Sequence, residues 1–221
     1  IAEIDNVCIE IDNEEIPIMD GSAKDFLNIL RKTPVNTLLK KRKYLKISKK
    51  FELLDGDRKI SIEPNETSFK VEFQLNYKNI IIGKQKNIVD FQKSNLDDVY
   101  VSRTFCLFED IEKIKKLGLA KGGSLENAVV VDNDKVLNDG GLRNQKEFVN
   151  HKILDLAGDF VLSGYRIIGK VTCFQGGHQL SNMFLRSLMK SHSAYDVVEF
   201  NEEILIKKVN QNDNLKIAVN A

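Results

Sequence analysis

The chain has 221 residues, of which 42% are hydrophobic and 29% are charged, and its formal net charge is +1. This length is enough for one large domain or two small ones, each with its own hydrophobic core. The balance of 33 basic and 32 acidic residues argues against bulk electrostatic binding to nucleic acid, although local basic patches remain compatible with it. No apolar run approaches the length of a membrane span, so we expect no transmembrane segment.

Cysteine usage indicates the compartment. Cys8, Cys106 and Cys173 are an odd number, lie far apart and form no Cys-x-x-Cys pair. This pattern is typical of a reducing setting and not of a disulfide framework, so we expect a cytoplasmic protein, with peripheral contact to a membrane left open.

The first predicted elements are a strand and a helix. Residues 7–12 alternate between apolar and polar side chains and predict a strand, although the chain starts at Ile1 almost directly inside this pattern. Such a start predicts a fragment that begins within a domain, and a processed chain is the alternative. Ser22 is the predicted N-cap of a helix of about ten residues from Ala23.

A change of pattern near residues 40–45 predicts a domain boundary. The run Lys40-Lys41-Arg42-Lys43 is most simply a solvated turn between two units. We therefore divide the chain into residues 1–43, the C-terminal part of a first α+β domain, and residues 44–221, a second α+β domain.

The second domain starts with a predicted meander of antiparallel strands. The period-two segments are residues 44–54, 59–63 and 68–77, with turns at Asp55-Gly56-Asp57 and Pro64-Asn65-Glu66 and a further strand pair at 80–82 and 87–91. Helices follow at residues 96–101 and 109–117, the second ended by Gly118. Then come strands at 127–131 and 135–137, a helix at 145–162, a strand at 166–174, a helix at 178–191 and a strand at 195–200. The C-terminal remainder is polar, apart from residues 204–209. This order predicts an α+β layered domain.

The helix at residues 145–162 carries the clearest candidate site. His151, Asp155 and Asp159 are four residues apart and form one polar stripe. A histidine and a carboxylate at this spacing can bind one metal ion, but an ordinary hydrogen-bonded pair is the commoner case. The apolar residues elsewhere on the cylinder, expected to face a core, are Phe148, Ile153, Leu156 and Phe160.

His178 is the second candidate, since it follows Gly176-Gly177 at a strand-to-helix junction. A helix N-terminus disfavours positive charge and lowers the pKa of a histidine placed there. Asp159 is a candidate partner that would offset this effect and make His178 a general acid near neutral pH. A structural histidine at a cap is the alternative, and His192, at a helix end, carries little functional weight.

These residues alone do not complete a mechanism. A catalytic zinc takes three protein ligands and a water, whereas only His151 and Asp155 are placed as a pair. The loop Lys121-Gly122-Gly123-Ser124 is better interpreted as a turn than as a phosphate cradle, because no Gly-Lys-Ser/Thr follows.

Several short stretches in a fixed order carry a family resemblance. They are Ile4-Asp5-Asn6, residues 15–23 (Glu-Ile-Pro-Ile-Met-Asp-Gly-Ser-Ala), Arg103-Thr104-Phe105, residues 118–130 (Gly-Leu-Ala-Lys-Gly-Gly-Ser-Leu-Glu-Asn-Ala-Val-Val), residues 147–155 (Glu-Phe-Val-Asn-His-Lys-Ile-Leu-Asp), Gly158-Asp159 and Gly177-His178. Together they resemble the UDP-3-O-acyl-N-acetylglucosamine deacetylase family, zinc amidases of lipid A and hence lipopolysaccharide biosynthesis in Gram-negative bacteria. The resemblance covers nearly the whole chain.

The resemblance implies two two-layer α+β sandwich domains, with helices packed on mostly antiparallel sheets and the active site between the domains. It also implies Zn²⁺ as cofactor and hydrolysis of the N-acetyl group of UDP-3-O-acyl-N-acetylglucosamine, which releases acetate in the committed step of the pathway.

The matching positions imply residue roles. His151 and Asp155 match zinc ligands, and His178 matches a catalytic histidine that Asp159 keeps protonated. Thr104 matches a residue that stabilises the oxyanion. The matches for substrate binding are Phe105 at the sugar, Lys152 near the nucleotide-sugar, and an apolar acyl-chain passage in an inserted β-α-β unit (about residues 105–139) lined by Phe108, Ile111, Ala120, Gly123, Ala128 and Val130.

The departures from the family pattern matter as well. The family's first zinc-binding histidine and its general-base glutamate precede the Ile4-Asp5-Asn6 stretch, so we expect this chain alone to be inactive. Gln175 stands where many relatives have a basic residue, and Ser181 where asparagine is common. The alternatives are a truncated, non-catalytic product that binds nucleotide-sugar or acyl chain, and an unrelated metal hydrolase.

Overall fold

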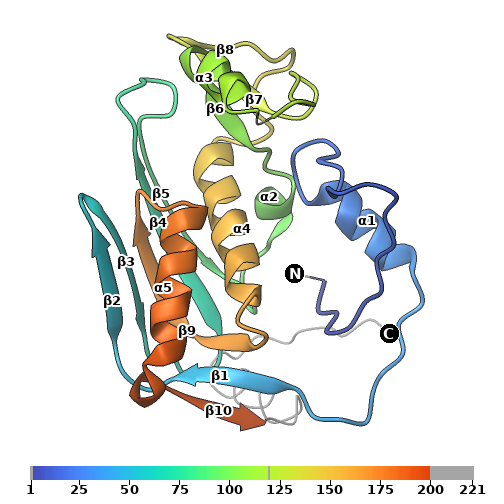
Figure 1. The fold of residues 1–221 in the computed structure, drawn as a ribbon, viewed down its shortest axis with the longest axis vertical. Coiled ribbons are helices and arrows are strands. Elements are labelled where there is room, and N and C mark those ends of the chain that lie inside the picture. Colours follow the sequence, from blue (N-terminus) through green and yellow to red (C-terminus); the bar gives the residue numbers. More distant parts are fainter. Residues whose placement is uncertain (1, 119, 200–221) are drawn as a thin grey trace.

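The computed structural model describes residues 2–118 and 120–199, and these residues form an α+β fold with two sheets, as predicted (Figure 1). The elements in chain order are α1 (Lys24–Lys32), β1 (Lys43–Ile47), β2 (Phe51–Asp55), β3 (Arg58–Glu63), β4 (Phe69–Asn76), β5 (Lys84–Asp90), α2 (Asp97–Tyr100), β6 (Phe105–Leu107), η1 (Phe108–Asp110), α3 (Ile111–Lys116), β7 (Val129–Asp132), β8 (Lys135–Val136), α4 (Glu147–Val161), β9 (Arg166–Phe174), α5 (His178–Lys190), η2 (His192–Ala194) and β10 (Tyr195–Glu199). In these described residues, no helix is long and apolar enough to cross a membrane.

Strand β9 is the centre of the larger sheet. It pairs parallel with β1 and β4 and antiparallel with β3, while β10, β2 and β5 extend the sheet outward from these neighbours. The β2–β3 hairpin forms at Asp55-Gly56-Asp57 as predicted. The simple meander was wrong, because β9 lies between β3 and β4.

Two of the predicted strand segments need correction. The segment 44–54 is broken into β1 and β2, since the backbone N–H groups of Ser48 and Lys49 both donate to the carbonyl of Ala194 and leave the ladder. Residues 80–82 form a turn and not a strand. There the Asn79 side chain accepts hydrogen bonds from the backbone N–H groups of Ile81 and Ile82.

Helices α4 and α5 cover one face of the larger sheet (Figure 1). The apolar side of α4 is buried as predicted, with Phe148, Ile153, Leu156 and Phe160 at most 2% exposed. Phe160 stacks on Phe184 of α5, with ring centroids 5.8 Å apart. The two helices thus share one core with the sheet, which fixes the direction in which the polar stripe of α4 points.

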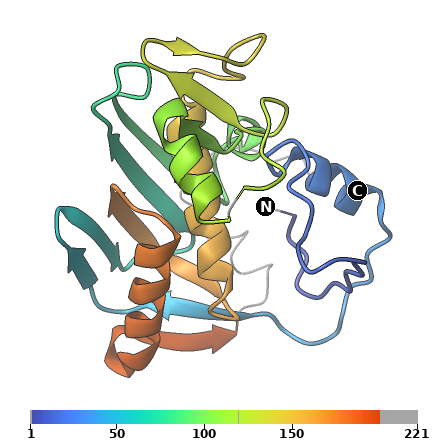
Figure 2. The ribbon, with the colours of Figure 1, turned by 45° about the horizontal axis from the view of Figure 1, so that its top comes forward.

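A second, three-stranded sheet is formed by β6, β7 and β8 near the N-terminal end of α4 (Figure 2). Strand β6 is parallel to β7, and η1 and α3 connect them, so this part of the chain is a β-α-β unit. Strand β8 adds an antiparallel edge.

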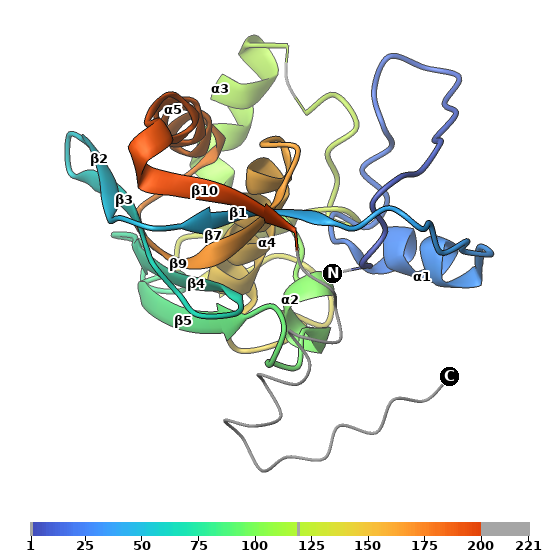
Figure 3. The ribbon, with the colours of Figure 1, turned by 90° about the horizontal axis from the view of Figure 1, so that it is seen from below.

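The N-terminal segment extends to one side of the sheet and its helices (Figure 3). Residues 7–12 are not a strand, and Val7, Ile9 and Ile11 are 46–62% exposed. Apolar and polar side chains do alternate in residues 7–12. Within the described part of the chain, however, no strand lies beside this segment to form the hydrogen bonds of a sheet. Helix α1 is present, but it begins at Lys24 with Ala23 as its N-cap residue, so the prediction of Ser22 as N-cap was wrong by one position. The Ser22 hydroxyl accepts the Lys24 N–H at 3.2 Å next to this cap. The patterned residues 204–209 lie outside the described residues.

Candidate metal and catalytic site

The hydrogen bonds of His151 define the state of its ring. His151 is 7% exposed, and its Nδ1 lies 3.1 Å from the backbone carbonyl oxygen of Ser102. A carbonyl can only accept, so we assign the proton to Nδ1. The second ring nitrogen, Nε2, lies 3.2 Å from Asp155 Oδ1.

This pair fits a metal ion. A bare Nε2 and a carboxylate oxygen are both acceptors, so their contact needs a proton or a cation between them. Two ligands at about 2.05 Å from a tetrahedral zinc lie about 3.3 Å apart, close to the observed separation. Over residues 2–118 and 120–199, no cluster of three or more His, Cys, Asp or Glu side chains is close enough to hold a metal, so His151 and Asp155 are a two-residue candidate.

His178 and Asp159 form the second pair predicted from the sequence. His178 Nδ1 lies 2.9 Å from Asp159 Oδ1, and its Nε2 lies 3.9 Å from Asp155 Oδ2. The Asp159 hydrogen bond raises the pKa of His178 above its ordinary value, against the opposing effect of partial burial, and the charge of Asp155 adds to the rise. The His178 ring beside the His151–Asp155 pair is thus more readily protonated than a free histidine.

The open side of His178 faces a cleft of about 530 Å³. Its lining combines polar and apolar side chains of α4, α5 and the residue after α4, namely Asp159, Leu162, His178, Gln179, Asn182, Met183 and Leu185. His178 is therefore reachable from solvent, and its side chain is 69% exposed.

Lys152 directly follows His151, so its Cα lies about 100° around the helix from that residue. Its long side chain reaches back, so that Nζ lies 3.1 Å from Asp155 Oδ2 and 5.5 Å from the centre of the Phe105 ring. Burial alone would raise the pKa of Asp155, but His151 and Lys152 outweigh it and lower the pKa well below its ordinary value. Asp155 is therefore a carboxylate at neutral pH.

Phe105 and Thr104 begin the small sheet next to α4. The Phe105 ring contacts Phe148 edge-on at 4.9 Å between centroids and lies 6.4 Å from the His151 ring. The Thr104 backbone is fixed on both sides, since its N–H donates to Gly21 and its carbonyl accepts from Val129. Phe105 thus lies beside the His151–Asp155 pair, and Thr104 directly precedes it in the chain.

The residues expected to contact the acyl chain lie in the β-α-β unit but differ in exposure. Phe108 is 53% exposed on η1, Val130 on β7 is 6% exposed, and Ile111 and Ala128 are half-buried. Gly123 is in a turn, and a Cβ there would lie 3.1 Å from the Ala120 carbonyl oxygen. Their role toward an acyl chain stays a prediction.

Gln175, which stands where many relatives have a basic residue, binds the backbone at the end of β4. Its side-chain amide accepts the Asn76 N–H at 3.0 Å and donates to the Asn76 carbonyl at 2.5 Å, which mimics a strand pairing at the end of β4. The other departure, Ser181, is 2% exposed on α5.

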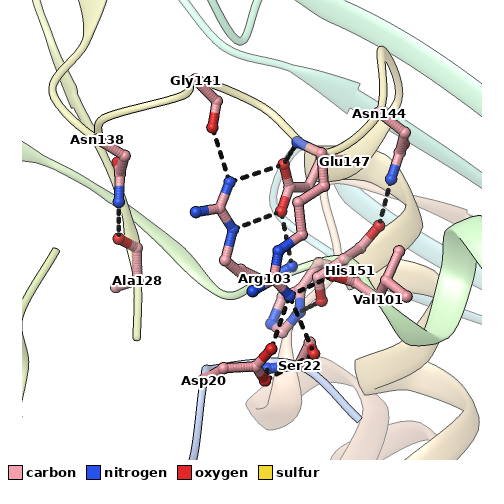
Figure 4. A network of polar contacts seen from close by, with 12 residues as sticks. Asp20, Ser22, Val101, Arg103, Ala128, Asn138, Gly141, Asn144, Glu147 and His151 are labelled. Atoms are coloured by element: carbon pink, nitrogen blue, oxygen red, sulfur yellow. Dashed lines mark hydrogen bonds and ion pairs between the residues drawn. The ribbon is translucent and has the colours of Figure 1, made fainter. Parts of the chain in front are cut away.

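Sequence reasoning missed Glu147 and Arg103. Glu147 is 0% exposed, and its carboxylate is paired with the Arg103 guanidinium at 2.8 Å (Figure 4). A signal was available, because Glu147 precedes His151 by four residues and extends the polar stripe by one turn. Arg103 comes immediately before Thr104.

Comparison with known proteins assigns the family. The model of the UDP-3-O-acyl N-acetylglycosamine deacetylase family matches residues 1–190. The chain belongs to this family. Relatives named UDP-3-O-acyl-N-acetylglucosamine deacetylase include those of Nautilia profundicola (39% identical over 90% of this chain and 68% of the relative), Shewanella violacea (39%, 90% and 66%) and Citrifermentans bemidjiense (41%, 89% and 65%). The chain thus spans about two thirds of the length of these curated deacetylases.

Proposed function

We propose that the protein containing this chain is a zinc-dependent deacetylase that removes the N-acetyl group of UDP-3-O-acyl-N-acetylglucosamine and releases acetate during lipid A biosynthesis. The names of its relatives support the reaction and the substrate. The observation that carries the proposal is the pairing of His151 Nε2 with Asp155 at 3.2 Å, with His178 beside them. The three free cysteines support a reducing, cytoplasmic setting.

In this proposal His151 and Asp155 hold the zinc ion, which when bound supplies a Lewis acid for a water and for the amide carbonyl. His178 holds a proton at its outer nitrogen, because Asp159 occupies Nδ1, and delivers it toward the departing amine. Thr104 stabilises the oxyanion with its hydroxyl.

The substrate residues complete the proposal. Phe105 and Lys152 contact the sugar and the anionic nucleotide, and the β-α-β unit at about residues 105–139 receives the acyl chain. Lys152 is suited to substrate binding because its ammonium lies over the Phe105 ring and beside Asp155.

We also propose that residues 1–43 and 44–221 belong to two domains.

The test separates metal ligation from proton transfer. In the protein expressed from its full reading frame, we expect His178→Ala to lower acetate release about 100-fold or more with zinc content unchanged. Asp155→Ala should lower both zinc content and activity. Zinc content by elemental analysis and acetate release from the UDP-sugar are the two measurements, and equal zinc loss in both variants would contradict this division of roles.

A non-catalytic binding protein is the second candidate, since the described residues offer a pair of metal ligands and not a triad. Binding of the UDP-sugar without acetate release from zinc-loaded protein would favour it.

A further inference from the structure

The buried Glu147 carboxylate binds two separate backbone segments. Oε1 accepts hydrogen bonds from the Arg103 backbone N–H at 3.0 Å and from Arg103 Nε at 2.8 Å. Oε2 accepts from Arg103 Nη2 at 3.2 Å and from the Arg143 backbone N–H at 2.6 Å. Both oxygens are therefore used to hold the chain around Arg103, and the Arg103 guanidinium compensates the buried charge.

The peptide unit between Ser102 and Arg103 links Glu147 to His151. Its N–H donates to Glu147 Oε1, and its carbonyl accepts from His151 Nδ1 at 3.1 Å. In a trans peptide the N–H and the C=O point in opposite directions within one rigid plane. The plane thus spans one turn of α4, from Glu147 to His151, and any rotation breaks both hydrogen bonds together.

Two further hydrogen bonds fix the residues next to this peptide (Figure 4). Arg143 Nη1 donates to the Val101 carbonyl at 2.9 Å, and Arg103 Nη2 donates to the Gly141 carbonyl at 2.8 Å. The residues that flank the peptide are therefore fixed to the loop before α4.

We propose that Glu147 is a positioning residue for His151, acting through the 102–103 peptide. Metal-binding histidines commonly donate their second ring N–H to an acceptor that fixes the tautomer and raises ligand basicity. Here that acceptor is a carbonyl whose own N–H donates to a buried carboxylate, and hydrogen bonds in such a chain strengthen one another. The inference rests on the proposed function, in which His151 is a zinc ligand.

The experiment follows the His151 ring proton directly. In the protein expressed from its full reading frame and labelled with ¹⁵N-histidine, the buried His151 Nδ1–H should give a slowly exchanging NMR resonance. Glu147→Gln keeps the shape of the side chain but replaces one carboxylate oxygen by an NH₂ group. That group then faces N–H donors and cannot accept their hydrogen bonds. We expect it to accelerate exchange of the Nδ1–H at least tenfold and to weaken Zn²⁺ binding about 10–100-fold.

The matched control is Glu72→Gln, which breaks the ion pair of Glu72 with Lys86 at 2.6 Å on the sheet. It should leave the Nδ1–H exchange and the Zn²⁺ affinity within twofold. A folded Glu147→Gln chain in which both quantities also stay within twofold of the parent overturns the proposal.

A measurement without substitution applies if Glu147→Gln does not fold. In the parent chain, the Arg103 amide and the His151 Nδ1–H should exchange through one opening, with protection factors that agree within about threefold. Protection of the ring proton that far exceeds protection of the Arg103 amide refutes the coupling. If the protein expressed from its full reading frame binds no Zn²⁺, the proposed function fails, while the ring-proton measurements still test the positioning.

Discussion

Asp20 shows how one carboxylate ties the N-terminal segment to the loop before α4. Its Oδ1 accepts from the Ser22 hydroxyl at 2.7 Å, and its Oδ2 lies 2.8 Å from Arg143 Nη1. Burial would raise the pKa of Asp20, but the hydrogen bonds of Ser22 and Arg143 outweigh burial and lower it. Asp20 therefore remains charged to lower pH in the folded chain than in the unfolded one.

The substitution Asp20→Asn should reduce stability in a pH-dependent way. Because the folded-state pKa is the lower one, the stabilisation is complete above the unfolded value near pH 4 and is lost as the pH falls through the folded value. We expect the variant to lose about 1–2 kcal/mol of unfolding free energy at pH 7 and a smaller amount at pH 2.5. Urea unfolding at the two pH values measures this.

The control for this prediction is Asp139→Asn, since Asp139 is an exposed residue of the loop before α4. It should change the unfolding free energy by less than about 0.5 kcal/mol at either pH. A loss for Asp20→Asn that stays the same at pH 2.5 would contradict an electrostatic origin.

At the residue scale, the spacing of residues along the sequence predicted two contacts. One lies within helix α4, and the other joins α4 to the first residue of α5. His151 and Asp155 meet as the four-residue spacing indicated, and Asp159 meets His178. The partner of Glu147 could not be predicted in this way, because Arg103 precedes it by 44 positions and a glutamate at a helix start normally faces solvent. A buried ion pair depends on tertiary placement, which periodicity does not contain.

At the element scale, Asn138 organises the β-α-β unit. Asn138 is 5% exposed, its side-chain oxygen accepts the Val130 N–H, and its amide donates to the carbonyls of Leu125 and Ala128. One side chain thus fixes the loop before β7 and the start of that strand.

Replacing this side chain should loosen the unit. For Asn138→Ala we expect a loss of about 2–4 kcal/mol of unfolding free energy, because buried backbone groups lose their partners. Hydrogen exchange should accelerate first at the amides of β7 and β8. Asn127→Ala is the control, since Asn127 bonds Ser124 and Gly122 in an exposed turn and should cost less than about 1 kcal/mol. An equal cost for both would show that burial of the amide is unimportant.

The strands show what a pattern along the chain can and cannot predict. The sequence predicted a strand at residues 166–174, as the structure has it in β9, but not its place between β3 and β4. The apolar pattern reports which side chains face a core, and β9 carries buried Ile167, Ile168, Val171 and Cys173, the first two as direct neighbours. It says nothing about which strands lie on either side, so the meander was the simplest order and the wrong one.

At the scale of the whole molecule, Gly21 joins three segments that are distant in sequence. Its carbonyl accepts the Thr104 N–H at 2.8 Å, and a Cβ built on it would lie 1.9 Å from the Asn127 carbonyl oxygen. Its φ of +79° is in the left-handed region that favours glycine. The N-terminal segment therefore contacts the start of the small sheet so closely that a methyl group does not fit.

Gly21→Ala should separate these segments more than backbone strain alone would. Gly140 has a φ of +80° and nothing within 4 Å of its built Cβ, so Gly140→Ala measures the conformational cost by itself, about 1–2 kcal/mol. For Gly21→Ala we expect a further 1–3 kcal/mol of lost unfolding free energy, roughly the cost of overpacking. Exchange of the Thr104 amide should also accelerate, because its acceptor is displaced together with the N-terminal segment. Equal costs for the two variants, with Thr104 exchange unchanged, would mean that the segment around Gly21 is not held against the small sheet, and that Thr104 is positioned by Val129 alone.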